Sequence, residues 1–345
     1  MYRVHLLPAD FGDTILIEYG GGDGKRVLID AGAPGSYGGV RKKIESLPKQ
    51  QRVFELLVVT HIDEDHIGGV LPLLDDAKEL GIELKEIWFN GYQHLTDILG
   101  PKQGERLTSR IVDGKYDWNT SFDKHAVVVR PDGALPSFDF DGLKITLLSP
   151  KREQLEKLEK KWAAVIEEAG LVPGIGGTTP PEDIDDLLGD EELDVAALAR
   201  TEFRSDAAEA NGSSIAFAAE HEGKSVLFGA DAFPGVLAES LERMPEEERR
   251  RITAFKLPHH GSRNNLSTEL LKMLDCKTYL VSTNGKRFQH PDRESIARVI
   301  QRGGTPHLVF NYRTRFSECW DAGNLMRDHG YTVEYGEEGA VTLEL

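Results

Sequence analysis

The sequence predicts an α/β layered protein, made of two β-rich halves that are each flanked by helices, with an insertion between them. Three observations predict this class of fold. Short apolar runs alternate with helical patterns in both halves, the middle of the chain is irregular and acidic, and no repeat of fixed period is present. A length of 345 residues suits one large domain, so we expect a single domain, 1–345, with the insertion at about 91–210.

The first half reads as short strands separated by glycines. The strand candidates, rich in apolar and β-branched residues, are 2–7, 14–19, 26–30, 54–60 and 84–90. Apolar spacing typical of helices covers 40–47 and 68–80. The glycine-rich run at 20–24 predicts a hairpin turn between the second and third strands.

The middle of the chain is less regular. We expect strands at 126–130 and 143–149, followed by a charged helix at 151–170. A Gly/Pro-rich stretch then leads into an acidic run, and residues 181–210 hold eleven Asp and Glu against two Arg. We interpret 171–210 as a solvated acidic flap, with a partner-binding segment as the alternative.

The second half returns to regular alternation. The strand candidates are 213–220, 225–229, 252–257, 278–282 and 307–310, and the helical candidates are 266–274 and 293–302. The chain is expected to finish in a hairpin formed by 332–335 and 340–345.

Composition excludes several classes of protein. A formal net charge of −17 argues against a bulk nucleic-acid binder, although residues 251–320 carry twelve Lys and Arg against five Asp and Glu. Two cysteines, Cys276 and Cys319, cannot build a disulfide framework, which favours a reducing, cytoplasmic location. We find no apolar run of about 18 residues and no signal-peptide core, so we expect no membrane segment.

The strongest local signal places four ligand-type side chains within six residues: His61, Asp63, Asp65 and His66. They follow a buried strand and precede a helix, so they lie in a turn at a strand's carboxyl end. Imidazole and carboxylate suit Zn²⁺, Mn²⁺ or Fe, and the lack of thiolates argues against a structural zinc. The alternative is a helix N-cap supplied by Asp63 or Asp65.

Two further sites carry the same chemistry. Asp231 follows the apolar strand at 225–229, where a buried carboxylate needs a metal or a hydrogen-bond partner, unless it caps the next helix. His259 and His260 follow another strand and precede a glycine.

Together these motifs resemble the metallo-β-lactamase-fold hydrolase superfamily, in a ComEC-like branch with HxDxDH in place of the usual HxHxDH. The supporting stretches are FGDTILI (11–17), VLIDAG (27–32), NGSS (211–214), LFGAD (227–231), LPHHGS (257–262) and STNG through HP (282–291). The resemblance implies an αββα sandwich of two β-sheets flanked by helices, holding two divalent ions, Zn²⁺ or Mn²⁺, bridged by Asp231. It says nothing specific about the insertion.

The resemblance also implies roles for single residues. Site 1 would use His61, Asp63 and Asp231, and site 2 would use Asp65, His66, Asp231 and His259. The expected catalytic residues are Asp65, His66 and His260. Substrate contacts, or contacts that support the ligands, are expected from Asp30, Asn211, Ser262, Asn284 and His290. Alternatively, Asp30 caps its turn and His290 only introduces the following helix.

One departure from the family pattern affects site 1. Most members have a third site 1 histidine before the strand that leads to the bridging aspartate, whereas this chain reads Glu209-Ala210-Asn211-Gly212. Asn211 could supply an oxygen there, or the position could be open to water. We therefore expect site 1 to be the weaker site, and the carboxylate at Asp63 makes Mn²⁺ more competitive. His94 is another candidate ligand, and we expect His125 and His221 to be structural or on the surface.

Three classes of function follow. The first is a phosphodiesterase or nuclease, acting through a hydroxide activated by two metals on a phosphodiester such as the end of a nucleic-acid single strand. The second is a metallohydrolase of a small ester, lactone or phosphocholine-like substrate. The third is a weakly active or inactive sensor or defence-system partner, which would contact another protein through the acidic insertion. The sequence leaves the oligomeric state open.

Overall fold

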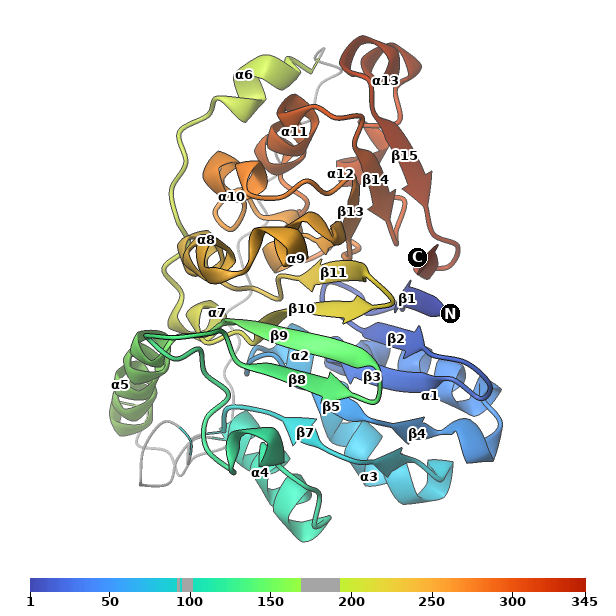
Figure 1. Ribbon diagram of the computed structural model, residues 1–345, viewed down its shortest axis with the longest axis vertical. Helices are drawn as coiled ribbons and strands as arrows, with labels where there is room; N and C mark the ends of the chain where they lie inside the picture. The colour runs from blue at the N-terminus through green and yellow to red at the C-terminus, as the bar shows by residue number, and fades with distance from the viewer. Residues whose placement is uncertain (92–93, 95–101, 169–192) are drawn as a thin grey trace.

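Two β-sheets pack face to face in the computed structural model, which describes residues 1–91, 94, 102–168 and 193–345 (Figure 1). The first sheet has six strands, in the order β16 (Val341–Glu344), β1 (Tyr2–Leu6), β2 (Ile15–Tyr19), β3 (Lys25–Ile29), β5 (Leu56–Val58) and β7 (Ile87–Trp88). The second has eight, in the order β15 (Thr332–Tyr335), β14 (His307–Phe310), β13 (Thr278–Val281), β12 (Ile252–Lys256), β11 (Lys224–Phe228), β10 (Ala216–His221), β9 (Leu143–Ser149) and β8 (Ser137–Phe140). A separate pair joins β4 (Val53–Phe54) and β6 (Glu83–Leu84).

The central hydrophobic core lies between the two large sheets. It contains Ile17 and Val27 from the first sheet and Phe217 and Phe228 from the second, with Trp88 among them. These side chains alternate with outward-facing neighbours because successive residues of a strand point to opposite faces. Each large apolar side chain that is fully buried contributes about 1.5–3 kcal/mol to stability.

Helices cover the outer faces of both sheets. The helices on the six-stranded sheet are α1 (Tyr37–Ser46), α3 (Val70–Leu80) and α4 (Lys102–Asp113). Those on the eight-stranded sheet include α6 (Val195–Ala199), α8 (Pro234–Arg243), α10 (Thr268–Lys272), α11 (Arg293–Arg302) and α13 (Gly323–His329). Each set shares a core with the sheet beneath it, for example Ile44 with Leu28 and Ile296 with Leu308. The predicted αββα sandwich is therefore confirmed.

Other helices connect these layers. They are α2 (Glu64–Ile67), α5 (Arg152–Glu168), α7 (Glu209–Gly212), α9 (Glu246–Arg250) and α12 (Arg315–Glu318), with single turns at Pro34–Ser36, Lys49–Gln51, Thr120–Phe122 and Pro258–Gly261. Helix α5 agrees with the helix expected at 151–170, of which 169 and 170 lie outside the described residues. None of the helices in the described ranges is both long and apolar enough to cross a membrane.

The terminal hairpin predicted for 332–335 and 340–345 is wrong. Strand β15 lies parallel to β14 in the eight-stranded sheet, whereas β16 lies antiparallel to β1 in the six-stranded sheet. The turn between them carries the chain from one sheet to the other, and it brings the two ends of the chain together (Figure 1). A glycine-rich turn signals a reversal of the chain but does not specify which strands pair afterwards.

Three other strand predictions need correction. Each of the strands expected at 54–60 and 84–90 divides between two sheets, and the ion pair of Glu55 with Lys85 (2.7 Å) stands at the two breaks. The strand expected at 126–130 makes only the bridge of Val129 with Lys151 among the described residues. There the amide of Asn90 replaces a neighbouring strand, because it bonds both the N–H (2.8 Å) and the C=O (2.9 Å) of Val127.

The predicted insertion, 91–210, is partly integral to the fold. Its strands β8 and β9 extend the eight-stranded sheet, and β8 was missed because it is a half-exposed edge strand. Of the predicted acidic flap, 171–192 lies outside the described residues. In the remainder, Val195 is buried in the core beside α11, whereas most residues from 200 to 208 are exposed.

Candidate metal centre

The site lies where five strands end. Strands β3 and β5 run parallel in the first sheet, and β11, β12 and β13 run parallel in the second. The carboxyl ends of parallel strands meet at one edge of a sheet, so the loops that follow them converge. These loops carry Asp30, the run from His61 to His66, Asp231, the pair His259 and His260, and Asn284.

The loop after β5 is fixed by buried hydrogen bonds. Asp30 accepts bonds from both the backbone N–H (2.8 Å) and the hydroxyl (2.7 Å) of Thr60. A Cβ at Gly12 would lie 1.7 Å from the carbonyl oxygen of Asp65, so only glycine permits this close approach. Asp63 is at the N-cap position of α2, but its side chain makes no capping bond within the described residues. The alternative, in which Asp63 caps the helix, is therefore not supported.

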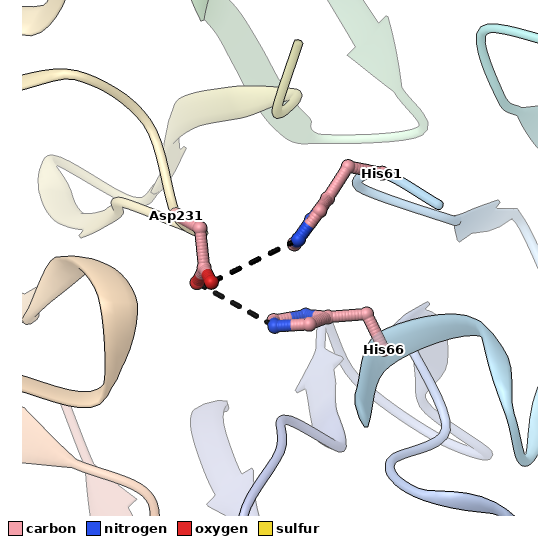
Figure 2. Close-up of side chains that lie close together, drawn as sticks. All are labelled: His61, His66 and Asp231. Carbon is pink, nitrogen blue, oxygen red and sulfur yellow. Dashed lines mark ion pairs between the residues drawn. The ribbon is translucent and has the colours of Figure 1, made fainter. Parts of the chain in front are cut away.

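His61 and His66 turn their Nε2 atoms toward Asp231, as Figure 2 shows. The Nε2 atom of His66 lies 3.5 Å from Oδ1 of Asp231, and that of His61 lies 3.8 Å from Oδ2. The Nε2 atom of His61 is also 3.7 Å from Oδ2 of Asp63, and that of His66 is 3.9 Å from Oδ2 of Asp65. The two oxygens of one buried carboxylate thus face different histidines.

The two histidines after β12 diverge because both adopt positive φ angles, 46° and 53°. The Nε2 atom of His260 lies 3.4 Å from Oδ2 of Asp65, whereas that of His259 lies 3.7 Å from Oδ2 of Asp231. The sequence placed His259 with Asp65 and His66. The structure instead places His260 there, and it places His259 on the same oxygen of Asp231 as His61.

A polar acceptor beside Nδ1 orients each of the four imidazole rings. The Nδ1 atom of His66 donates to Asp30 (2.8 Å), and that of His260 donates to the carbonyl of Ser282 (2.9 Å). The Nδ1 atoms of His61 and His259 lie 3.0 Å from the hydroxyl of Thr60 and from Oδ1 of Asn265, respectively. An acceptor at Nδ1 selects the tautomer whose Nε2 has a free lone pair, as metal-binding histidines require.

The donor atoms that remain fit a metal centre. Within the described residues, the Nε2 atoms of His61, His66 and His260 and Oδ1 of Asp231 are buried without a hydrogen-bond partner. Leaving such groups unpaired is costly, so a ligand is expected to satisfy them. Two groups have donor atoms within 4.8 Å of one another: His61, His66 and Asp231, and Asp65, His66 and His260. Nitrogen and oxygen donors suit Zn²⁺ or Mn²⁺.

The electrostatics of the site favour added positive charge. Burial alone lowers the pKa of His66, but the charges of Asp231, Asp65 and Asp30 outweigh it and raise this pKa well above its ordinary value. For His259, burial is likewise outweighed, chiefly by Asp231, and the pKa rises to about 9. Clustered carboxylates therefore stabilise cations here, whether protons or metal ions.

The model of the metallo-beta-lactamase superfamily matches residues 7–286 of the chain. The chain belongs to the metallo-beta-lactamase superfamily. A metal-dependent hydrolase, as the sequence predicts, is the activity that this membership supports. A search of curated proteins finds no match.

Solved structures with the same fold resemble this superfamily member only distantly. The metallo-beta-lactamase fold protein YhfI from Bacillus subtilis is 12% identical with a TM-score of 0.43, and the match covers 99% of each chain. Zn²⁺-bound PqqB from Methylobacterium extorquens is 12% identical with a TM-score of 0.44, covering 100% of each chain. A diphosphatase of the PhnP family is 11% identical with a TM-score of 0.39, covering 99% of this chain and 98% of the other. Similarity this low does not indicate a substrate.

Five residues were predicted to contact the substrate or to support the metal-ligating side chains. Asp30 lies against His66, and the amide nitrogen of Asn211 lies 3.4 Å from Nδ1 of His259. The ring of His290 packs on that of His259, with centroids 5.3 Å apart. Asn284 donates a hydrogen bond to the side chain of Asp10 (3.2 Å), whereas the hydroxyl of Ser262 accepts a bond from the backbone of Asn264 (3.3 Å).

The three remaining histidines considered from the sequence, His94, His125 and His221, lie outside the metal-ligand cluster. His221 bonds through Nδ1 to the carbonyl of Gly142 (2.7 Å), and His94 packs edge-on against Trp118. His125 is exposed. The structure joins none of these three, within its described residues, to the ligand-type groups of the site.

Several supporting residues of the site were not predicted from the sequence. Asp206 lies in the predicted flap, yet it accepts hydrogen bonds from Asn211 (2.7 Å) and Asn265 (3.0 Å) beside His259. Lys256 is fully buried and pairs with Asp13, whose other oxygen lies 3.5 Å from Nδ1 of His260. A signal existed for Lys256, because one charged residue in an apolar strand needs a buried partner.

Proposed function

We propose that this protein is a phosphodiesterase with two divalent metal ions. The observation that carries the proposal is that the two carboxylate oxygens of Asp231 face different sets of histidines. Its Oδ1 faces His66 (3.5 Å), while its Oδ2 faces His61 (3.8 Å) and His259 (3.7 Å). A shared carboxylate between two donor sets is the arrangement of two-metal sites, which suit in-line displacement at phosphorus.

Each proposed site has four protein donors. Site 1 takes His61, Asp63, Asp231 and His259, and site 2 takes Asp65, His66, Asp231 and His260. His259 thereby takes the place of the histidine that the family pattern has before the strand leading to the bridging aspartate. The extra carboxylate of Asp63 makes site 1 harder than a set of histidines, which favours Mn²⁺ there.

When bound, such ions lower the pKa of water toward neutrality and offset the charge of a phosphodiester. The chain positions this chemistry through the bonds at Nδ1, which hold the four imidazole rings in place before substrate arrives. The side chains of His61, His66 and His260 are fully buried, whereas those of Asp63 and His259 are 42% and 21% exposed. Substrate therefore enters on the side of Asp63 and His259.

Charge near this opening supports an anionic substrate. Residues 251–320, which include His259, His260 and Arg287, hold twelve Lys and Arg against five Asp and Glu, although Lys256 and Arg298 among them are buried. Arg287 lies beside Glu64, the neighbour of Asp63, with 3.2 Å between its Nη1 and Oε2 of Glu64. Basic residues next to a metal centre suit a phosphate backbone better than a neutral ester. The relation to the ComEC-like branch, nuclease activity, the cytoplasmic location and a protein partner for the acidic insertion stay predictions.

The test combines metal analysis with a substrate panel. Purified protein is loaded with Zn²⁺ or Mn²⁺, its metal content is measured by mass spectrometry, and hydrolysis of bis(p-nitrophenyl) phosphate, single-stranded DNA, RNA and a lactone is followed. We expect about two equivalents of metal and cleavage of phosphodiesters. Asp231→Asn is the matched control and should lose both metal and turnover while its circular dichroism spectrum is retained. Hydrolysis of the lactone alone by the metal-loaded protein would overturn the proposal and favour the small-ester alternative.

A further inference from the structure

An exposed aromatic ring stands at the opening of the candidate metal centre. Phe288 is 40% exposed, and the described residues contain only two other exposed large hydrophobic residues, Met1 and Val112. Its ring centroid lies 6.5 Å from that of His259 and 6.2 Å from that of His290, on which it stacks at an angle of 28°. The ring thus lies beside the partly exposed histidine of proposed site 1.

A second phenylalanine and an arginine complete this surface. The rings of Phe11 and Phe288 are 6.0 Å apart and nearly perpendicular, at 80°. The guanidinium of Arg287 lies 5.0 Å from the centroid of Phe11 and 5.2 Å from that of Phe288. We name Phe11, Arg287 and Phe288 the aromatic rim.

The aromatic rim is held in place from both halves of the chain. The backbone N–H of Asn284 donates to the carbonyl of Asp10 (2.8 Å), which ties the segment of Phe11 to the loop that carries Phe288. Glu64 pairs with Arg287 (3.2 Å). This pairing fixes the position of the guanidinium, whose planar face is then available for stacking.

We propose that the aromatic rim binds the nucleobase of a nucleotide substrate whose phosphodiester lies at the metal centre. This inference rests on the proposed function and narrows its substrate class. Bases stack on aromatic side chains and on arginine planes, and such stacking tolerates any base because every base has a π-face. A flat heterocycle suits two phenylalanine rings and a guanidinium better than the flexible acyl chain of an ester does. The rim accounts for an apolar ring exposed next to buried polar groups.

The experiment compares two diesters that release the same leaving group. Thymidine 5′-(p-nitrophenyl phosphate) carries a base, whereas methyl p-nitrophenyl phosphate does not. Their kcat/KM values are measured for the wild type, Phe288→Leu, Phe288→Trp and Val112→Ala, with Val112 as an exposed hydrophobic residue outside the rim. Binding of thymidine 5′-monophosphate to each protein is measured in parallel by calorimetry, so that one readout does not depend on turnover.

We expect Phe288→Leu to lower the preference for the thymidine diester, as a ratio of kcat/KM values, by about tenfold, and to weaken nucleotide binding by a similar factor. Phe288→Trp should retain both properties, and Val112→Ala should match the wild type. Equal losses on both diesters, or nucleotide binding unchanged in Phe288→Leu, would overturn the role of the rim. If the wild type cleaves neither diester, the proposed function is contradicted instead. In that case, weaker nucleotide binding in Phe288→Leu would still support the role of the rim.

Discussion

The Nε2 atom of His260 lies 3.4 Å from Oδ2 of Asp65 and joins a loop of the eight-stranded sheet to a loop of the six-stranded sheet. Asp65 belongs to α2, which follows β5, whereas His260 follows β12. Neither sheet supplies the donors of either proposed metal site alone, so an ion bound here would hold the two sheets together as well as serve the reaction.

The first prediction separates the two adjacent histidines. His260→Gln should lose the metal of site 2 and His259→Gln that of site 1, so each variant should bind about one equivalent in place of two. Metal content and the rise of Tm on adding Zn²⁺ or Mn²⁺ measure this. Ligand present at about 100 times its Kd stabilises a protein by about 2.7 kcal/mol. Each variant should retain only part of the stabilisation that metal gives the wild type. Two bound equivalents in His259→Gln would contradict our assignment of site 1.

The second prediction concerns the carboxylate behind His66. Asp30 accepts a hydrogen bond from Nδ1 of His66 (2.8 Å) and two bonds from Thr60. Asp30→Asn should lower the metal affinity of site 2 by about 10–100-fold, because it weakens the orientation and basicity of the histidine. Titration with a competing chelator measures the affinity. Asp206→Asn, beside His259, is the matched comparison and should act on site 1; an effect of Asp30→Asn on site 1 alone would argue against this arrangement.

The third prediction concerns the buried ion pair of Lys256 and Asp13. Both side chains are almost inaccessible, and the charge of Lys256 keeps the pKa of Asp13 low despite burial, which alone would raise it. Lys256→Met leaves a buried carboxylate without its partner and should cost about 3–5 kcal/mol of unfolding free energy. Urea denaturation measures this cost. The double variant with Asp13→Asn should recover part of the lost unfolding free energy. An equal or larger loss in the double variant would contradict the view that the unpaired carboxylate of Asp13 causes the loss.

The fourth prediction concerns acid stability. The hydrogen bond from His5 (2.8 Å), opposed by burial and assisted by the charges of Lys43 and Arg26, lowers the pKa of Glu18 to about 2. A carboxyl whose pKa is lower in the folded state stabilises the protein above its ordinary pKa, and this stability is lost as the pH falls toward 2.

Glu18→Gln should therefore reduce the unfolding free energy at neutral pH by on the order of 2 kcal/mol. The difference from the wild type should shrink between about pH 4.5 and pH 2. Urea denaturation across this range provides the measurement. A difference that stays constant with pH would show that Glu18 acts through packing rather than through its charge.

The sequence was sufficient to predict the part of the site that lies within one short segment of the chain. His61 to His66 follow a buried strand and precede a helix, so their convergence follows from a single strand, turn and helix. The division between His259 and His260 could not be predicted in this way, because it depends on two positive φ angles and on acceptors at Asn265, later in the same loop, and at Ser282, in the loop after β13.

Long-range pairing limited the rest of the prediction. Asp206 was assigned to a solvated flap because its neighbours are acidic, although two buried amides bind its side chain. Phe288 is a single aromatic residue without periodicity, so nothing nearby in the sequence indicates that it faces Phe11. Alternation of apolar residues located most strands, but it did not reveal that β15 and β16 belong to different sheets.

The pairing of β16 with β1 also has a consequence for how the protein is made. His5 contacts Thr342 across this pairing, and the two residues are 337 positions apart in the chain. During synthesis, β1 can pair with β2 early, but its other edge stays open until β16 has left the ribosome. Contacts of such wide separation form slowly, and an open strand edge can pair with other chains. A nascent chain stalled before residue 341 should therefore aggregate more readily than a chain in which β16 has paired with β1.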